Sequence, residues 1–444
     1  MRLLRFAIVL ATTAAAVRVG EPTIWTPHRT APVSPPRRHV LAAGAAAALV
    51  ARPPPAHALS DEQRLVGDVW SQVNAQFFDD TFNGLGADGW AAQKTEAITR
   101  AGDGPDAAYD AIRRMLGALG DPYTRFLEPE QYEALASAAR GGGVGVGVQL
   151  QLEPSSGRVV VLQVAAGGPA ARGGVRAGDE VVDVDGEAMA GATAELCAAK
   201  IRGDAGSRVR LGVRHAAADA AAGQAAENVQ TLELERAPVT LNAVEAGSVA
   251  LGGGRRAGLV RIASFSQETP AQLVDAVRAA LATAGGVDAL VVDLRGNAGG
   301  YMPAGVAAAE LFLERGAPIV SEVRRAGAAL PSVAQGVGAE TKVPLCVLVD
   351  GRTASAAEIM AAALQDNRRA TLAGPGRTFG KGRIQNVQRL VGGSGVSVTR
   401  ARYVTPKGRD IHGVGLTPDV VADACAATEP DARCVEAVLA RMVL

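Results

Sequence analysis

Residues 289–300 read A-L-V-V-D-L-R-G-N-A-G-G, and this stretch decides how the C-terminal half of the chain folds. Its first six residues, Ala289–Leu294, are apolar except for Asp293 and form a short run that is typical of a central strand buried on both faces of a sheet. A second buried strand is predicted at Pro344–Val349. Further strands are predicted at Ala257–Ile262, Thr371–Ala373 and Val396–Tyr403, and helices at Pro270–Ala284, Ala304–Leu313 and Ala354–Gln365. This alternation predicts an α/β domain from about residue 238.

The second half of the opening stretch, Asp293–Gly300, follows the central strand at its carboxyl end. Ligand and catalytic groups gather at that end of the strands in such sheets. The glycines allow a close approach of the backbone, so the N–H group of Gly300 is predicted to donate a hydrogen bond to an oxyanion. Asp293 and Arg295 are expected to hold the loop as an ion pair and not to act as acid or base.

Ser355 is the candidate nucleophile of this domain. It follows the strand Pro344–Val349 and a short turn, and it stands at the start of the helix Ala354–Gln365. The free N–H groups and the dipole of a helix N-terminus stabilise negative charge. The N–H of Ala356 is therefore the second predicted oxyanion donor. On position alone, an ordinary N-cap serine is the other interpretation of Ser355.

Lys381 is the candidate general base, in the segment T-F-G-K-G at residues 378–382. A lysine between two glycines and beside an aromatic residue is poorly placed as a solvated surface charge. Desolvation penalises the ammonium form, and a neutral lysine can take the proton of a serine. Gln385, four residues further on, could hydrogen-bond the amine and orient it. Taken alone, Lys381 could also be an exposed lysine in a glycine turn.

Histidine-based and nucleotide-binding sites find little support in the sequence. Of five histidines, three lie in the first 58 residues, and His215 and His412 have no partner motif nearby. A Ser-His-Asp triad or a zinc site is therefore not favoured. Gly141–Val148 does not satisfy G-x-G-x-x-G, and Gly374–Gly382 departs from the P-loop pattern. We predict neither a metal nor an organic cofactor.

The composition limits the partners and the covalent links of the chain. It has 444 residues, with 45 basic and 45 acidic side chains, and this neutral balance gives no support for a nucleic-acid partner. The four cysteines contain no C-x-x-C pair. Cys425 and Cys434 lie close together near the C-terminus and could form a local disulfide in an oxidising compartment.

Residues 1–58 are predicted to be a targeting presequence cleaved near Ala58. A basic start precedes the apolar run Phe6–Val17, and Arg18–Arg38 is similar to a plastid transit peptide. A twin-arginine pair, the apolar run Val40–Ala51 and a terminal A-H-A then resemble a Tat export signal. Both apolar runs are too short for a spanning helix. The order of signals resembles that of a thylakoid-lumen protein, and a bacterial exported protein is the simpler alternative.

Five regions are predicted along the chain, distinguished by their patterning. Leu65, Val69, Val73 and Phe77 recur every four residues, which indicates an amphipathic helix in a helical region. A β-rich region with short strands follows and then gives way to the α/β pattern. The predicted boundaries are 1–58 for the presequence, 59–139 for the helical domain, 140–236 for the β-rich domain, 237–424 for the α/β core and 425–444 for a C-terminal helix or tail.

Four motifs resemble those of the carboxy-terminal processing peptidases. They are Val292–Gly300, Thr353–Ile359 (T-A-S-A-A-E-I), Thr378–Gln385 (T-F-G-K-G-R-I-Q) and Asp410–Asp419 (D-I-H-G-V-G-L-T-P-D). The resemblance implies a ClpP/crotonase-like protease core in which Ser355 is the nucleophile, Lys381 the base and Gln385 its orienter. Ala357 replaces a second serine of the family motif, and the Ser–Lys spacing is one residue longer than the family pattern.

The β-rich region resembles a PDZ domain. The resemblance lies in Gly145-Val146-Gly147-Val148 and in the segment Gly168–Val182. It implies that Gly145, Val146, Gly147 and Val148 form the loop whose N–H groups receive a C-terminal carboxylate, while the first strand pairs with the substrate tail. The whole fold is then a mixed α/β protein with a helical domain, a PDZ-like domain and a protease core.

The resemblance implies a serine endopeptidase that removes a C-terminal extension from a protein substrate with a free C-terminus. With the presequence, the expected substrate is the precursor of a photosystem II reaction-centre protein in the thylakoid lumen. We expect a monomer, and contact with the thylakoid membrane surface stays open. A broad-specificity protease of a bacterial envelope and a non-catalytic PDZ scaffold are the alternatives. The scaffold is disfavoured because Ser355 and Lys381 are both present.

Overall fold

The computed structural model describes residues 59–102, 104–153, 156–165, 167–215, 229–240, 243–283, 286–327, 329–340, 342–426 and 432–442. The predicted presequence, residues 1–58, lies outside the described residues. None of the helices in the described ranges is long and apolar enough to span a bilayer.

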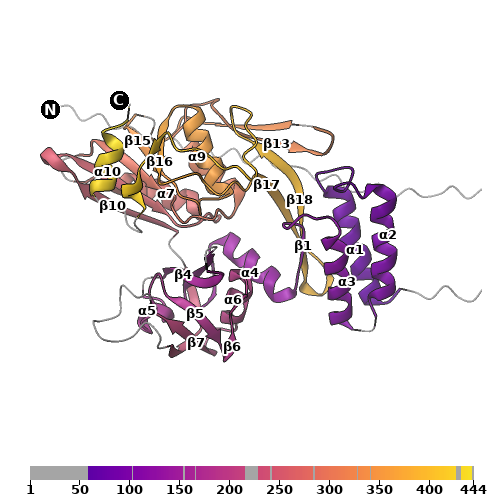
Figure 1. The fold of residues 1–444 in the computed structure, drawn as a ribbon. Coiled ribbons are helices and arrows are strands. Elements are labelled where there is room, and N and C mark those ends of the chain that lie inside the picture. Colours follow the sequence, from indigo (N-terminus) through magenta and orange to yellow (C-terminus); the bar gives the residue numbers. More distant parts are fainter. Residues whose placement is uncertain are drawn as a thin grey trace, which may run out of the picture. The chain divides into compact units, whose positions relative to one another are not determined.

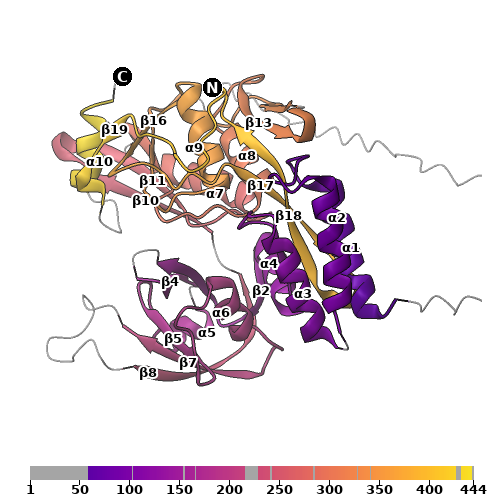
Figure 2. The same ribbon diagram turned by 45° about the vertical axis from the view of Figure 1, so that its right-hand side comes forward.

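The N-terminal helices lie side by side in both views (Figures 1 and 2). They are α1 (Asp61–Gln76), α2 (Gly86–Arg100) and α3 (Pro105–Gly117). Ser60 caps α1, accepting the N–H of Gln63 at 3.2 Å, while the Gln63 side chain accepts the N–H of Ser60 at 3.1 Å. The predicted apolar stripe is confirmed, since Val69, Val73 and Phe77 are fully buried.

The chain then passes through β1 (Arg125–Leu127) and α4 (Pro129–Arg140) into the PDZ-like region. The strands there are β2 (Gly142–Gly145), β3 (Val148–Glu153), β4 (Arg158–Val164), β5 (Glu180–Val184), β6 (Glu187–Ala188), β7 (Arg208–Arg214), β8 (Gln230–Glu235) and β9 (Ala237–Thr240), and the helices are α5 (Pro169–Arg172) and α6 (Ala194–Ile201). The main sheet has the order β3-β4-β5-β7-β8 and is antiparallel, with β6 beside β5, while β2 pairs with β9.

A six-stranded sheet with the order β10-β11-β12-β15-β16-β19 forms the centre of the C-terminal half. Its strands are β10 (Val244–Ala250), β11 (Arg256–Ile262), β12 (Ala289–Asp293), β15 (Leu345–Leu348), β16 (Ala370–Gly374) and β19 (Val420–Val421). All neighbouring pairs except β10 with β11 are parallel. The carboxyl ends of β12 and β15 therefore meet at one edge.

Both faces of this sheet are covered, as the apolar run Ala289–Leu294 predicts. Leu290 and Val292 pack in one core with α7 (Thr269–Leu281), α8 (Met302–Glu310) and α9 (Ala356–Asp366). Val291 faces the other side, in a core with η4 (Asp423–Cys425) and α10 (Ala432–Leu439). Cys425 and Cys434 form a disulfide within that second core.

A second sheet has the order β1-β18-β13-β14, with β17 also paired to β18. Its remaining strands are β13 (Pro318–Arg324), β14 (Ala329–Val333), β17 (Arg383–Arg389) and β18 (Gly395–Val404), and short 3-10 turns lie at η1 (Gly252–Gly254), η2 (Arg325–Gly327) and η3 (Val391–Gly393). Strand β18 pairs with β1 from the N-terminal part of the chain. The predicted mixed α/β fold class is confirmed.

Candidate active site

Ser355 lies where the chain turns from β15 into α9. Its backbone has φ 57° and ψ −118°, a conformation that residues other than glycine rarely adopt. The turn is held by Thr353, whose hydroxyl donates to the carbonyl of Leu294 at 2.9 Å and accepts the N–H of Asp350 at 2.9 Å. The side chain of Ser355 is half-buried at the N-terminus of the helix. A strained serine in a rigid turn is a common feature of functional sites.

The glycine loop after β12 lies directly against Ser355. A β-carbon built on Gly299 would lie 2.8 Å from the β-carbon of Ser355 and 3.0 Å from the amide nitrogen of Ala356. Only a glycine fits there, and its φ of +98° also favours glycine. The structure thus brings together the two segments that were predicted to form an oxyanion hole.

The two predicted oxyanion donors belong to different structures: Gly300 lies in the loop after β12, and Ala356 begins α9. The carbonyl of Gly299 accepts the N–H of Phe265 at 2.9 Å, and the N–H of Tyr301 donates to the carbonyl of Phe265 at 2.8 Å. The N–H of Gly300 lies between these two bonds and takes no part in them. Ala356 is the first residue of α9, so its N–H belongs to the helix end that has no partner within the helix.

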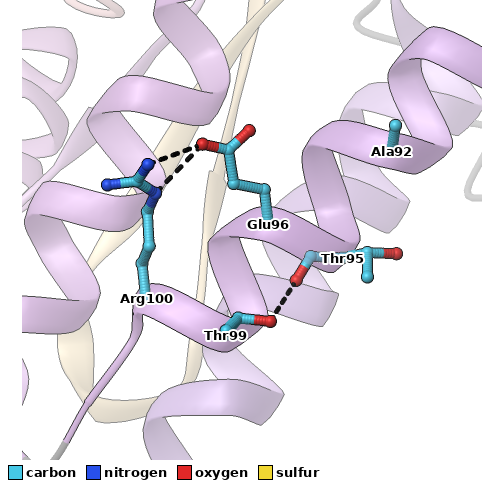
Figure 3. Close-up of a pocket in the computed structure, with 5 residues that line it drawn as sticks. All are labelled: Ala92, Thr95, Glu96, Thr99 and Arg100. Atoms are coloured by element: carbon cyan, nitrogen blue, oxygen red, sulfur yellow. Dashed lines mark hydrogen bonds and ion pairs between the residues drawn. The ribbon is translucent and has the colours of Figure 1, made fainter.

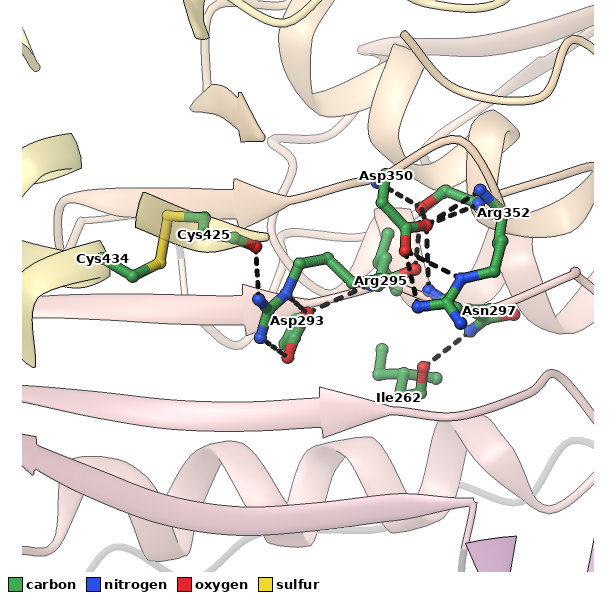
Figure 4. Close-up of polar contacts among 11 residues, drawn as sticks. Ile262, Asp293, Arg295, Asn297, Asp350, Arg352, Cys425 and Cys434 are labelled. Atoms are coloured by element: carbon green, nitrogen blue, oxygen red, sulfur yellow. Dashed lines mark hydrogen bonds and ion pairs between the residues drawn. A yellow bond between two sulfur atoms is a disulfide. The ribbon is translucent and has the colours of Figure 1, made fainter. Parts of the chain in front are cut away.

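Asn297 fixes the glycine loop to its neighbours. Its carbonyl accepts the N–H of Ala354 at 2.9 Å, and its side-chain oxygen accepts the N–H of Gly299 at 2.8 Å. The side-chain amide donates to the carbonyl of Ile262 at 2.7 Å (Figure 4). Asn297 is fully buried, so all three bonds are shielded from water. No role was predicted for this residue.

The expected ion pair between Asp293 and Arg295 is confirmed, and it is buried. Nε of Arg295 lies 2.8 Å from one carboxylate oxygen and Nη2 lies 2.8 Å from the other. Nη1 donates to the carbonyl of Cys425 at 2.6 Å, which links the loop to the disulfide (Figure 4). Breaking a buried pair of this kind costs about 3–5 kcal/mol. The pair therefore anchors the base of the glycine loop.

A second carboxylate, Asp350, joins the glycine loop to the serine turn. It accepts the N–H of Gly296 at 3.0 Å and the N–H of Thr353 at 3.0 Å. It also pairs with the guanidinium of Arg352 at 3.0 Å (Figure 4). The loops after β12 and β15 are thus fastened to each other at several points.

Lys381 lies in the turn between β16 and β17. Its side chain was predicted to be shielded from solvent, and it is half-buried. Its ammonium nitrogen lies 5.1 Å from the centre of the Tyr123 ring. Gln385 is in β17 opposite Thr399, to whose hydroxyl its side-chain amide donates at a long 3.5 Å. The roles of Lys381 as base and Gln385 as its orienter stay predictions.

Glu358 is a second residue of the site, after Asn297, whose role was not predicted. It is fully buried and accepts the N–H of Ser355 at 2.9 Å. It also accepts the hydroxyl of Thr378 at 2.5 Å and the N–H groups of Gly380 and Lys381 at 2.7 and 2.9 Å. Burial raises the pKa of this carboxyl, and the four donated hydrogen bonds oppose that effect. One side chain thus joins the serine segment to the lysine segment.

A signal for Glu358 was present in the sequence. It stands three residues after Ser355, the S-x-x-E spacing of a capping box, within an alanine-rich helix. An acidic residue in a helix that is otherwise apolar needs buried partners. The distant partners in residues 378–381 could not be inferred from that spacing.

Sequence and fold comparisons agree on one family. Residues 256–422 match Peptidase family S41, and residues 160–215 match a PDZ domain. The chain is 40% identical over 380 residues to the chloroplastic C-terminal processing peptidase of Tetradesmus obliquus, covering 83% of this chain and 79% of that protein. The chain belongs to the C-terminal processing peptidase family.

Two further comparisons support this membership. The peptidase is 35% identical over 370 residues to the carboxyl-terminal-processing protease of Synechocystis, with 83% of each chain covered. It also resembles a solved photosystem II D1 C-terminal processing protease, with 38% identity and a TM-score of 0.63 over 85% of this chain and 97% of that one. The predicted family resemblance is confirmed, and the chain is a serine-type peptidase.

The predicted carboxylate-binding loop of the peptidase lies between β2 and β3. Gly145 ends β2, Val148 begins β3, and Val146 is buried in the PDZ-like core. The carbonyls of Val146 and Gly147 accept the N–H groups of Ala170 and Ala165 at 2.8 and 2.7 Å. Strand β3 is the last strand of its sheet, so one edge can accept an added strand. Carboxylate binding by this loop stays a prediction.

A hollow of about 640 Å³ lies elsewhere, on α2 of the peptidase (Figure 3). It is lined by Ala92, Thr95, Glu96, Thr99 and Arg100. Its polar groups bond one another, as Arg100 pairs with Glu96 at 2.9 Å and the hydroxyl of Thr99 donates to the carbonyl of Thr95 at 2.9 Å. Large pockets are the default candidates for binding sites. This one lies on a single surface helix and holds none of the groups that surround Ser355.

No group of three or more His, Cys, Asp or Glu side chains in the described ranges is arranged to hold a metal ion.

Replacing Gly299 by alanine should reduce kcat/KM by about 10²-fold or more, because a displacement of about 1 Å at a catalytic centre has that effect. The added methyl group would overlap the carbonyl oxygen of Ala354 at 2.7 Å as well as Ser355. Gly392→Ala is the control, since Gly392 also has a positive φ, +78°, but open space around it. Peptide cleavage and thermal melting should be measured for both. Cleavage by the Gly299 variant at near the normal rate would contradict the predicted oxyanion loop.

Proposed function

We propose that this peptidase removes a C-terminal extension from the precursor of the photosystem II reaction-centre protein, in the thylakoid lumen of a plastid. Its relative from Tetradesmus obliquus is named chloroplastic, and the similar solved structure is a D1 processing protease. The signals read in residues 1–58 support the same compartment. The observation that carries the proposal is the contact of Gly299 with Ser355 and Ala356, at a serine turn that Glu358 joins to Lys381.

The proposed reaction is an acyl transfer through Ser355. Its hydroxyl oxygen attacks the scissile carbonyl carbon while the neutral amine of Lys381 takes the hydroxyl proton. The N–H groups of Gly300 and Ala356 hold the oxyanion that forms. The C–N bond then breaks, and the Lys381 ammonium gives its proton to the leaving amine.

Hydrolysis of the acyl-enzyme repeats these steps with water as the nucleophile. Lys381 takes a proton from the attacking water, the oxyanion forms again, and the serine leaves with that proton. Gln385 is proposed to orient the amine. The loop Gly145–Val148 is proposed to receive the C-terminal carboxylate of the substrate, with β3 pairing to its tail.

The proposal can be tested with a synthetic peptide that ends in the precursor's C-terminal extension. The mature chain, from about Leu59, should cut it once and release the extension as a single fragment, identified by mass spectrometry. The same peptide with an amidated C-terminus should be cleaved much more slowly, because the carboxylate is then absent. Equal cleavage of unrelated peptides would favour a broad-specificity protease. Accumulation of only the mature reaction-centre protein in a strain without this enzyme would contradict the substrate.

A further inference from the structure

Tyr123 is a residue outside the four family motifs whose ring lies next to the proposed base. It belongs to the turn between α3 and β1, and it is half-buried. The ammonium nitrogen of Lys381 lies 5.1 Å from the centre of its ring, within the range of a cation–π interaction. We propose that Tyr123 is a positioning residue for Lys381, whose ring stabilises the ammonium that forms when Lys381 takes the proton of Ser355. This inference rests on the proposed dyad.

The turn that carries Tyr123 is fixed by hydrogen bonds. Asp121 accepts the N–H groups of Tyr123 and Thr124 at 3.3 and 3.1 Å, and the Thr124 hydroxyl at 2.6 Å. The hydroxyl of Thr124 in turn accepts the N–H of Thr399 at 3.0 Å, in a bond that is buried. Thr399 is the residue of β18 that pairs with Gln385. The tyrosine is therefore held on the same sheet that carries Gln385.

The lysine turn packs against His412 on its other side. A β-carbon on Gly382 would lie 2.9 Å from the backbone nitrogen of His412, and the N–H of Gly413 donates to the carbonyl of Gly380 at 2.9 Å. The imidazole of His412 meets the ring of Tyr123 edge to face, with the ring centres 6.0 Å apart. Tyr123 thus lies against the ammonium of Lys381 and a histidine ring.

Burial favours the uncharged form of both aromatic groups, and the charges around them act in both directions. Burial lowers the pKa of His412, and Arg383 lowers it further, while Asp410 and Asp121 oppose this. Burial also raises the pKa of Tyr123, helped by Asp121 and Glu358 and opposed by Arg383. These charged neighbours come from the start of β17, from α9, from the segment before β1 and from the loop after β18. The cation that faces the Tyr123 ring is then the one on Lys381.

The ring acts on one protonation state of the lysine more than on the other. The negative face of an aromatic ring attracts an ammonium, whereas it gains little from a neutral amine. The ammonium forms as the serine attacks, so the interaction strengthens in the transition state, which is the condition for raising kcat. The strength of cation–π interactions corresponds to about a 2- to 30-fold effect on the rate.

The test compares three substitutions in the mature chain. Tyr123→Phe keeps the ring and should keep kcat within about 2-fold, because the cation–π attraction comes from the ring face. Tyr123→Leu should lower kcat by about 2- to 30-fold with KM unchanged. The pH profile of kcat/KM for Tyr123→Leu should also extend to lower pH, because the ring no longer stabilises the protonated form of Lys381. Tyr123→pentafluorophenylalanine keeps the shape of the ring but reverses its charge distribution, so the ring face repels the ammonium and kcat should fall at least as far as in Tyr123→Leu.

The acylation of Ser355 by a small activated ester provides a readout that is independent of the natural substrate. If the wild-type protein is acylated but does not process the precursor peptide, the proposed substrate fails while the inference on Tyr123 can still be decided. Tyr109→Leu is the matched control, since that half-buried tyrosine packs on Phe126 with ring centres 4.8 Å apart. An unchanged or raised acylation rate and an unchanged pH profile in the pentafluorophenylalanine variant would overturn the proposal.

Discussion

Replacing Ser355 or Lys381 by alanine should each lower kcat for a peptide with a free C-terminus by about 10⁴-fold or more. The double variant should be no worse than either single one, because a nucleophile without its base and a base without its nucleophile are both inactive. Both side chains are half-buried, so thermal melting should change little. The measurement is initial cleavage rates together with melting curves for the three variants.

Lys407→Ala provides the control for loss of a lysine. Lys407 lies after β18, is more than half exposed, and its ammonium is 3.9 Å from the carboxylate of Asp366. Its removal should leave kcat unchanged, because a surface ion pair contributes little. Full activity in either the Ser355 or the Lys381 variant would exclude the proposed mechanism. An additive loss in the double variant would show that the two residues do not act as one unit.

The central sheet could be predicted because its signal is local. Ala289–Val292 is apolar on both sides, and the structure buries Val291 in one core and Leu290 and Val292 in the other. The pairing of β1 with β18 was not predicted. A three-residue strand such as Arg125–Leu127 carries no pattern that identifies a partner some 270 residues away. No strand was therefore predicted at these residues.

In the candidate site, too, local features could be predicted and long-range ones could not. Ser355, Lys381 and the glycine loop could be predicted from short motifs, each of which follows a strand or starts a helix. The positive φ of Ser355 could not, since serine is uncommon in that conformation and only the surrounding turn imposes it. The contact of Tyr123 with Lys381 joins residues 258 positions apart, which spacing cannot reveal. The sequence was least informative about long-range contacts between buried polar groups.

Replacing Glu358 by alanine should lower the free energy of unfolding by about 3–5 kcal/mol, because it leaves buried hydrogen-bond donors without an acceptor. Those donors are the N–H groups of Ser355, Gly380 and Lys381 and the hydroxyl of Thr378. The serine and lysine segments then lose the acceptor they share. We expect kcat to fall by about 10²-fold or more, as for other small displacements of catalytic groups.

Glu358→Gln separates the effect on activity from that on stability, because it keeps the size of the side chain. The glutamine keeps one oxygen as an acceptor, while its NH₂ group faces at least one N–H donor and cannot accept its hydrogen bond. We therefore expect the cleavage rate to fall more than the free energy of unfolding does. The pH dependence has a defined sign. Burial raises the pKa of Glu358 above its ordinary value of 4.5, so folding favours the protonated form. The contribution of this protonation to the free energy of unfolding is complete below pH 4.5 and is lost as the pH rises through the folded-state pKa.

The unfolding free energy of the wild type minus that of Glu358→Gln should therefore decrease with rising pH above 4.5. Glu310→Gln is the matched control, since Glu310 is a half-buried carboxylate that also accepts backbone N–H groups, those of Gln335 and Gly336. Urea unfolding at several pH values and peptide cleavage should be measured for both variants. Normal cleavage by Glu358→Ala would show that the segments of Ser355 and Lys381 are held in place without their common acceptor. Equal loss of activity in the Glu310 variant would show that the position of Glu358 between the serine and lysine segments is not what matters, because any carboxylate that accepts backbone N–H groups would then have the same effect.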